Sequence, residues 1–412
     1  MSDSARIVIV GAGHAGGTAA ALLRQYGHVG AVSLIGAEPV APYQRPPLSK
    51  AWLKGEADED ALRLKAPEWY GDNQVDLRLA QTVETIDRAG QTVRLSDGET
   101  LAYDHLILAT GARARWLDID GVELDGVMAL RTAADAEALK AALAPVRHRV
   151  KRLVVIGGGY VGLEAAASAR ALGAELVIVE RESRILARVA CPILSRFFQA
   201  YHRERGVHFI LDATVERLSG EDGRVKAVHL GDGSVLDCDA VLVGVGAQPN
   251  DELARAAGLE CQDGVLVDLA ARTSDPAIFA IGDVTRRPLP LYDTVMRLES
   301  VPNALEQARQ AAAAIVGRPA PEPETPWFWS DQYDLKLQIA GVPISCDDMV
   351  VRGVPDAPGF ALFHMAGDLI QAVEAVNAPA EFLVGRQLIG RRTPVCRARL
   401  ADRATAMKAV AL

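Results

Sequence analysis

The chain has 412 residues, of which half are hydrophobic and about a quarter are charged, so two to three domains with large buried cores are expected. The formal net charge of -9 disfavours non-specific binding to nucleic acid or anionic lipid. No stretch approaches the ~20 apolar residues of a membrane span, and the first apolar run is too short for a signal peptide. The five scattered cysteines are typical of reduced thiols, so we expect a cytoplasmic protein that binds neither nucleic acid nor membrane.

The first predicted element is a buried parallel strand at Arg6–Val10, which leads into a glycine-rich loop. A helix is predicted over Gly17–Gly27 and a second strand over Ala31–Gly36. This order of strand, loop, helix and strand is the context that a dinucleotide-binding loop requires. The glycines follow the G-x-G-x-x-G spacing at Gly11, Gly13 and Gly16.

The same spacing returns later in the chain in the same context. A strand at 152–156 precedes the second loop, a helix is predicted over Gly162–Gly173, and a strand follows at Glu175–Glu180. Either loop alone could be a tight turn without a ligand, but two copies in the right context predict two bound dinucleotides. The second set of glycines is Gly157, Gly159 and Gly162.

Further elements follow these units. A helix is predicted over Asn303–Val316, and the proline-rich stretch 317–326 predicts a linker before a C-terminal antiparallel sheet. The other predicted strands are His105–Ala112, Ala240–Asn250 and Ile278–Asp283.

An acid after the second strand of such a unit accepts hydrogen bonds from ribose hydroxyls. In the second copy this acid is Glu180, whose charge would repel a 2′-phosphate and favour NADH over NADPH. Arg181 and Arg184 lie nearby and weaken that inference. In the first copy Gly36 stands at the simplest position, and Glu38 is the nearest acid.

Six stretches together resemble the ferredoxin reductases of the putidaredoxin reductase type, which depend on FAD and NADH. The resemblance covers essentially the whole chain. It implies an α/β fold with two Rossmann-like nucleotide-binding domains, as in glutathione reductase, and a C-terminal α+β domain that covers the flavin. The FAD domain would take residues 1–112 and 246–322, the NADH domain 113–245 and the C-terminal domain 323–412. The stretches are "PYQRPPLSKAWL", "LILATGA", "GGGYVGLEAA", "TSDPAIFAIGDV", "LESVPNALEQA" and "FWSDQYDLKLQIAG".

The resemblance assigns non-covalent FAD to the first loop and NADH to the second. The family's ribose-side acid falls at Ala37, so Glu38 or the backbone of Ala37 would make that contact. Asp283 would accept from the ribityl chain, and the helix near Asn303 would point its N-terminus at the flavin. The implied FAD contacts are Gly11, Gly13, His14, Ala15, Gly16, Ala37, Glu38, Arg45, Lys50, Val83, Ala109, Thr110, Gly111, Arg131, Gly282, Asp283 and Val301. Those for NADH are Gly157, Gly159, Tyr160, Val161, Gly162, Glu180 and Gly244.

Lys50 and Glu164 are the implied catalytic residues, because the family's corresponding lysine and glutamate form an ion pair near the flavin N5 atom. The alternative is that both are solvated surface charges. The first nucleotide unit lacks the redox cysteines of the disulphide reductases and peroxidases, and the five cysteines are expected to be buried structural thiols. No metal site is expected, including at His202 and His208, and the chain has no C-x-x-C motif for an iron–sulfur cluster.

The implied reaction passes electrons from NADH through FAD, one at a time, to an acidic [2Fe–2S] ferredoxin that serves a cytochrome P450 or a ring-hydroxylating oxygenase. Docking would be transient and would use a basic face. Trp329 would lie between flavin and partner, or be an ordinary core aromatic. An NADH oxidase, a disulphide reductase and a flavoprotein of the apoptosis-inducing-factor kind are the alternatives. The candidate docking residues are Arg309, Trp329, Lys336 and Lys408.

Overall fold

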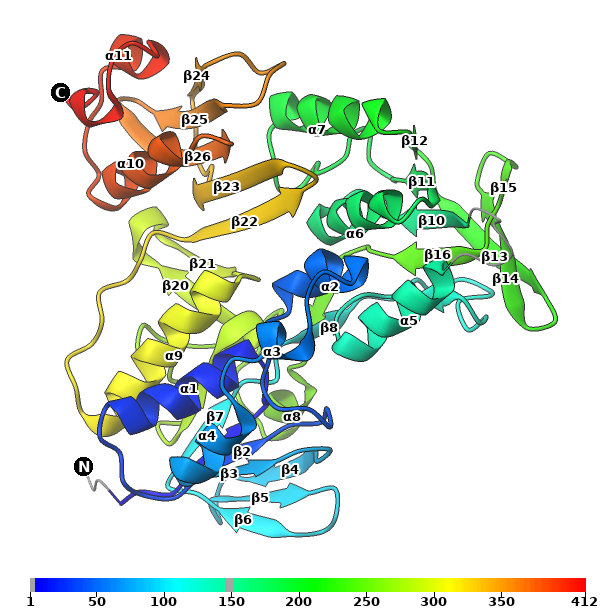
Figure 1. The fold of residues 1–412 in the computed structure, drawn as a ribbon. Coiled ribbons are helices and arrows are strands. Elements are labelled where there is room, and N and C mark those ends of the chain that lie inside the picture. The colour runs from blue at the N-terminus through cyan, green and yellow to red at the C-terminus, as the bar shows by residue number, and fades with distance from the viewer. Residues whose placement is uncertain (1–3, 145–150) are drawn as a thin grey trace. The chain divides into compact units, whose positions relative to one another are not determined.

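The computed structural model describes residues 4–144 and 151–412 (Figure 1). Contacts divide the chain into two compact units. The first unit takes in the chain up to Gln44, Glu59–Arg113 and Gln248–Phe328, and the second takes in Arg45–Asp58, Ala114–Ala247 and Trp329–Leu412. The boundaries of the three expected domains stay a prediction.

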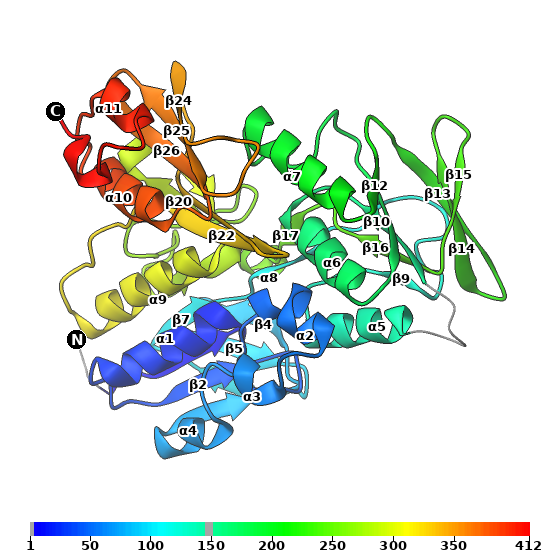
Figure 2. The same cartoon turned by 45° about the horizontal axis from the view of Figure 1, so that its top comes forward.

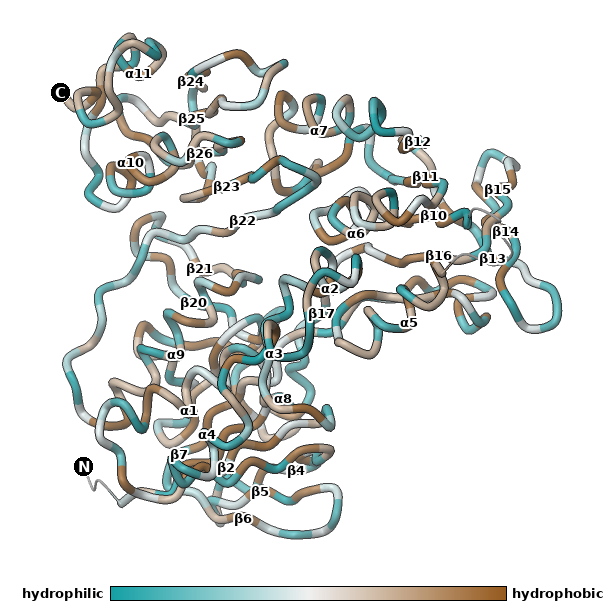
Figure 3. Tube along the Cα trace, viewed as in Figure 1, coloured by the Kyte–Doolittle hydropathy of each residue, from teal (hydrophilic) through white to brown (hydrophobic). Residues whose placement is uncertain are grey.

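The first unit contains a five-stranded parallel sheet in the order β19-β7-β1-β2-β3. Its β-branched strands alternate between two cores, since Ile7 and Ile9 pack on one face while Val8 and Val10 pack on the other. Helices α1 and α9 cover the first face, and their alanines permit close packing. Figure 3 shows the strands of this sheet mainly in brown, as expected for a sheet buried on both faces. The bounds are β1 Ile7–Val10, β2 Val32–Ile35, β3 Val75–Arg78, β7 His105–Leu108, β19 Ile278–Ala280, α1 His14–Gln25 and α9 Val301–Val316.

Smaller elements complete the first unit. An antiparallel sheet of β4, β5 and β6 packs its apolar residues into the second core. A mixed sheet contains β18, β20 and β21, with β18 parallel and β21 antiparallel to β20. The bounds are α3 Glu59–Leu62, α4 Pro67–Asp72, β4 Val83–Asp87, β5 Thr92–Leu95, β6 Thr100–Ala102, α8 Glu252–Ala256, β18 Val265–Leu266, η2 Gly282–Val284, β20 Thr285–Leu289, η3 Pro290–Tyr292 and β21 Thr294–Arg297.

The second unit repeats the parallel arrangement in the order β12-β11-β10-β16-β9. Figure 2 shows helices α5, α6 and α7 around this sheet. The bounds are β9 Val127–Met128, α5 Ala133–Leu143, β10 Arg152–Ile156, α6 Tyr160–Ala171, β11 Glu175–Val179, α7 Pro192–Glu204, β12 Val207–Ile210, β13 Val215–Glu221, β14 Arg224–Leu230, β15 Val235–Asp237 and β16 Ala240–Val243. Two short helices, η1 Pro46–Ser49 and α2 Ala51–Lys54, also belong to this unit, while β8 Ala112–Ala114 and β17 Ala247–Pro249 lie where the chain passes between units.

The last part of the second unit is a five-stranded sheet in the order β22-β23-β26-β25-β24, antiparallel as predicted. Helix α10 packs on β23 and β26, where Gly385 keeps the helix close to Val373. The α/β fold class with a separate antiparallel sheet is therefore confirmed. The bounds are β22 Trp327–Gln332, β23 Leu335–Gly341, β24 Asp348–Arg352, β25 Phe360–Ala366, β26 Leu369–Val376, α10 Pro379–Gly390, α11 Arg397–Ala401 and η4 Met407–Ala409.

Three predicted helices begin earlier than the sequence indicated. Helix α1 starts at His14 and α6 at Tyr160, because each glycine loop turns directly into its helix. Helix α9 starts at Val301, because the Ser300 hydroxyl caps it by accepting from the Asn303 N–H. Residues 317–326, which begin with Gly317, the C-cap of α9, form no helix or strand. This agrees with the predicted linker.

Two further predictions concern the burial of the cysteine thiols and the absence of membrane spans. All five thiols are free, with Cys191 and Cys238 buried. The expectation of five buried thiols is wrong for Cys261, Cys346 and Cys396, which are half-buried. Among residues 4–144 and 151–412, no helix has the length and apolar character to cross a membrane.

Candidate active site

The first glycine loop connects β1 to α1 in the first unit. A Cβ on Gly11 would lie 2.2 Å from the Ala109 carbonyl oxygen, and one on Gly16 would lie 1.9 Å from the Gly11 carbonyl oxygen. These two glycines are therefore required by packing. A Cβ on Gly13 would meet no described atom within 4 Å, and Gly13 is the N-cap of α1, which has no side-chain cap. The loop thus leaves space and a helix N-terminus, which fits a pyrophosphate.

In the second glycine loop, too, two glycines are required by packing and a third leaves space. A Cβ on Gly157 would lie 2.4 Å from the Gly244 carbonyl oxygen, and one on Gly162 would lie 2.5 Å from the Gly157 carbonyl oxygen. At Gly159 the nearest atom would be 4.0 Å away, and α6 also lacks a side-chain cap. The second unit therefore fits a pyrophosphate in the same way as the first.

Glu180 follows β11 and supports the second loop. Its Oε2 accepts a hydrogen bond of 2.7 Å from the Gly158 N–H, and its Oε1 accepts one of 2.9 Å from the Glu182 N–H. The two neighbouring arginines have protein partners. Arg181 pairs with Glu182 at 3.1 Å, while Arg184 donates to Ser195 Oγ at 2.7 Å and to backbone carbonyls.

The corresponding region of the first unit is built differently. Gly36 follows β2, and a Cβ there would lie 2.6 Å from the Ala12 Cβ, so no larger side chain fits without a shift. Glu38 instead accepts a hydrogen bond of 2.6 Å from the Tyr43 hydroxyl. This contact fixes the carboxylate of the nearest acid to the first loop.

Lys50 and Glu164 form an ion pair within the second unit. The Lys50 Nζ lies 2.6 Å from the Glu164 Oε2, and the carboxylate side chain is 7% exposed. Ser49 Oγ donates to the same oxygen at 2.6 Å, and Ser330 Oγ donates to Oε1 at 2.7 Å. Ser168 Oγ fixes the Ser49 carbonyl at 2.6 Å. The carboxylate therefore accepts three hydrogen bonds, which offset its desolvation, and the alternative of two solvated surface charges is wrong.

The hydrogen bonds continue beyond Ser330. Gln332 Nε2 donates to Ser330 Oγ at 3.2 Å, and Gln332 Oε1 lies 2.8 Å from His202 Nε2. Burial lowers the pKa of His202 to about 4, so the ring is neutral at pH 7. Sequence reasoning missed Ser49, Ser330, Gln332 and His202 as members of this network, although the first three stand inside the stretches "RPPLSK" and "FWSDQ".

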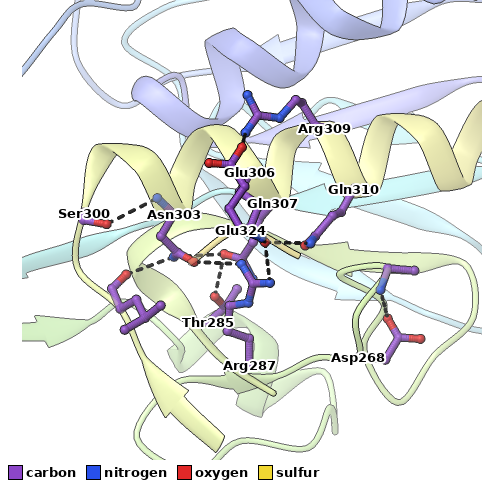
Figure 4. Close-up of polar contacts among 12 residues, drawn as sticks. Asp268, Thr285, Arg287, Ser300, Asn303, Glu306, Gln307, Arg309, Gln310 and Glu324 are labelled. Atoms are coloured by element: carbon purple, nitrogen blue, oxygen red, sulfur yellow. Dashed lines mark hydrogen bonds and ion pairs between the residues drawn. The ribbon is translucent and has the colours of Figure 1, made fainter. Parts of the chain in front are cut away.

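Helix α9 is joined to the Gly282 turn by a second buried network in the first unit (Figure 4). Gln307 Oε1 accepts from the Gly282 N–H at 2.8 Å. Asn303 Nδ2 donates to the same oxygen at 3.2 Å. Arg287 donates to Glu306 at 2.9 Å and to Asn303 at 3.1 Å. Because Asp283 and Val301 adjoin these residues, the network fixes the positions of two predicted flavin contacts.

The predicted FAD contacts are divided between the units. Arg45 Nη1 donates to the Arg131 carbonyl at 2.6 Å, which brings two of them together. Thr110 exchanges hydrogen bonds of 2.8 Å with Asn250, and Gly282 would place a Cβ 3.0 Å from that of Ala15. The first unit holds Gly11, Gly13, His14, Ala15, Gly16, Ala37, Glu38, Val83, Ala109, Thr110, Gly111, Gly282, Asp283 and Val301, and the second holds Arg45, Lys50 and Arg131. The predicted NADH contacts Gly157, Gly159, Tyr160, Val161, Gly162, Glu180 and Gly244 are all in the second unit.

The predicted docking residues have different environments. Lys336 on β23 and Lys408 in η4 are exposed, while Trp329 on β22 is half-buried. Arg309 is ion-paired with Glu324. The pairing leaves Arg309 a weaker candidate than the two lysines for contact with a partner.

Two dinucleotide loops on parallel sheets, followed by an antiparallel sheet, define a two-nucleotide oxidoreductase. The family model for pyridine nucleotide-disulphide oxidoreductases matches residues 5–308, and a reductase C-terminal model matches residues 327–411. The chain belongs to this family and, within it, to the ferredoxin reductases of the putidaredoxin reductase type. It is an FAD-dependent ferredoxin–NAD(P)+ reductase, and the family implies FAD and NAD(P)H as cofactors.

Individual relatives match over almost their whole length. A probable ferredoxin reductase, CtmF, of Castellaniella defragrans is 50% identical over 413 residues, which cover 100% of both chains. Putidaredoxin reductase CamA of Pseudomonas putida is 40% identical over 415 residues, covering 100% of this chain and 97% of the relative. The covalent putidaredoxin reductase–putidaredoxin complex has a chain that matches with a TM-score of 0.95 at 40% identity, covering 98% of each chain.

Proposed function

We propose that the protein uses NADH and non-covalent FAD to reduce an acidic [2Fe–2S] ferredoxin that serves a cytochrome P450 or a ring-hydroxylating oxygenase. Bound FAD supplies hydride acceptance from NADH and release of the electrons one at a time. The names of the relatives support the partner class, because they include putidaredoxin reductase and a probable ferredoxin reductase.

The observation that carries the proposal is that the stretch "RPPLSK", where the disulphide reductases carry redox cysteines, here supplies the lysine of a buried ion pair. The chain has no cysteine before Cys191, and its "RPPLSK" stretch instead supplies Ser49 and Lys50 to Glu164. Without a thiol there, electrons cannot pass to an internal disulphide. We therefore expect the electrons to leave the protein for an external one-electron acceptor.

The preference for NADH rests on Glu180. Its carboxylate is held at the second loop by the Gly158 N–H, where it would face the adenosine ribose and repel a 2′-phosphate. Arg184 already donates to Ser195, and Arg181 contacts Glu182 on the surface, so the sequence argument for NADPH rests on Arg181 alone.

Cytochrome c reduction tests the function. With NADH, the rate is expected to rise strongly when a [2Fe–2S] ferredoxin is added, and NADPH is expected to be the poorer donor. Acid precipitation is expected to release FAD. A rate that is indifferent to every ferredoxin, or a preference for NADPH, would contradict the proposal.

Charge steering tests the docking face. Lys336→Glu is expected to slow reduction of an acidic ferredoxin and to spare ferricyanide reduction, and the wild-type ferredoxin rate is expected to fall as salt rises. Lys226→Glu on β14 makes the same change in net charge at another exposed lysine and serves as the control. Equal slowing by both variants would show that net charge matters rather than Lys336.

A further inference from the structure

A cysteine, a histidine and a glutamate from three elements meet in the second unit, close to Tyr160 at the start of α6. Cys191 precedes α7, His364 lies on β25 and Glu374 lies on β26. The Cys191 Sγ, a ring nitrogen of His364 and a carboxylate oxygen of Glu374 all lie within 4.8 Å of one another. These residue types are the common protein ligands of zinc.

Two buried polar atoms of this cluster have no hydrogen-bond partner among residues 4–144 and 151–412. They are the His364 Nε2 and the Glu374 Oε2, and they stand 3.6 Å apart, which exceeds hydrogen-bond length. The Glu374 side chain is only 3% exposed, so its charge needs compensation. Two ligands at about 2.0 Å from a tetrahedral zinc ion stand roughly 3.3 Å apart, close to the observed separation.

The surrounding contacts fix the geometry of the cluster. Glu374 Oε1 accepts a hydrogen bond of 3.0 Å from the Cys191 N–H, which turns Oε2 toward His364. Phe197 on α7 packs edge-on against Phe360 on β25 with ring centroids 5.1 Å apart. The helix and the sheet that supply the three side chains are therefore held together independently of any ion.

A redox role for this cysteine is disfavoured. Burial, followed by the neighbouring Glu374 carboxylate, raises the pKa of the Cys191 thiol to about 12. A thiol with so high a pKa is a poor nucleophile, so oxidation chemistry does not explain the arrangement.

We propose that Cys191, His364 and Glu374 bind a zinc ion that fastens the start of α7 to β25 and β26. The ion takes Sγ, Nε2 and Oε2 as ligands, with water as the fourth. Binding releases the thiol proton to solvent and leaves the sulfur as thiolate. The ion has a structural role and takes no part in electron transfer.

Cobalt(II) is a suitable probe for the FAD-loaded enzyme. Addition of Co²⁺ is expected to produce visible bands of a tetrahedral thiolate complex at longer wavelength than the flavin absorbs, and Zn²⁺ is expected to abolish them. Equilibrium dialysis is expected to retain one Zn²⁺ per chain, and Zn²⁺ is expected to raise Tm.

Matched variants connect the signal to the cluster. Cys191→Ser, His364→Ala and the isosteric Glu374→Gln are each expected to weaken Zn²⁺ binding by at least about tenfold. Cys238→Ser removes another buried thiol and His208→Ala an exposed histidine, and both are expected to bind as the wild type does. FAD content reports whether each variant folds.

Two results would overturn the proposal. One is a wild-type enzyme that retains no Zn²⁺ or Co²⁺, which would make the cluster an ion pair of His364 and Glu374 alone. The other is equal binding by the wild type and Glu374→Gln with normal FAD content, which would place the ion elsewhere.

Discussion

The two glycine loops have the same spacing of three glycines. They differ in the contact between the middle of the loop and the residue that follows the second strand. Ala12 faces Gly36 in the first loop, whereas Gly158 faces Glu180 in the second. A Cβ on Gly36 would lie 2.6 Å from the Ala12 Cβ, and a Cβ on Gly158 would lie 2.8 Å from Ile185 and 3.2 Å from the Glu180 Oε2, so each pair has little room for a second side chain. The comparison teaches that a ribose-side acid directly after the second strand depends on a glycine in the middle of the loop.

The helices that follow the two loops also differ. Counted from the first glycine of each loop, Thr18 on α1 corresponds to Glu164 on α6. Thr18 is half-buried, whereas Glu164 is buried and accepts hydrogen bonds from Lys50, Ser49 and Ser330. The second unit therefore combines a nucleotide loop with a buried charge, and the first unit does not do so at this position.

The largest effect is expected where an added methyl group meets the backbone. Gly16→Ala places its Cβ 1.9 Å from the Gly11 carbonyl oxygen, so it should destabilise the first unit by about 3 kcal/mol or more and abolish FAD binding. Gly13→Ala faces open space and should lose FAD affinity while leaving the apoprotein equally stable. FAD content and denaturation midpoints of the apoproteins measure both effects, and equal destabilisation would refute the division of roles.

The buried charge gives the next largest effect. Glu164→Leu leaves the Lys50 ammonium without its carboxylate and should destabilise the second unit by about 3–5 kcal/mol. The matched change on the first helix, Thr18→Val, should cost less than about 1 kcal/mol. Urea denaturation measures the free energy of unfolding of both variants. Similar losses of stability would show that the ion pair is solvated.

A pH dependence tests the buried hydrogen-bond network of the second unit. The buried His202 has a pKa of about 4, below the ordinary value of 6.5, so the unfolded chain binds its proton first as the pH falls. Protonation of this histidine leaves the stability unchanged above pH 6.5 and lowers it below that, and the loss reaches about 3 kcal/mol once the pH is below 4. His202→Gln should flatten that part of the stability profile, whereas the exposed His208→Gln should leave it unchanged.

The smallest effect concerns nucleotide choice. Glu180→Gln removes the charge but keeps an oxygen for the Gly158 N–H, so the loop should stay folded. Discrimination between NADH and NADPH should fall by about 1–3 kcal/mol. The ratio of kcat/KM for the two donors measures it, with Glu38→Gln in the first unit as the control. A change of similar size in the control would contradict the assignment of the second loop.

Local patterns were enough to predict the two nucleotide units. Glycine spacing, β-branched strands and an acid after β11 act within a few tens of residues, so the sequence alone indicated both loops and Glu180. The "RPPLSK" and "GLEAA" stretches allowed Lys50 to be paired with Glu164, although only through the family resemblance.

What required the tertiary structure was the set of partners brought together from distant segments. Ser330, Gln332 and His202 join Glu164 from two other elements, and Cys191 meets His364 and Glu374 across a helix and two strands. A lone serine, glutamine or cysteine has no periodicity that predicts such a contact. Burial determines which residues make these contacts. A carboxylate that is removed from water needs hydrogen-bond donors, and the tertiary structure determines which donors lie within reach.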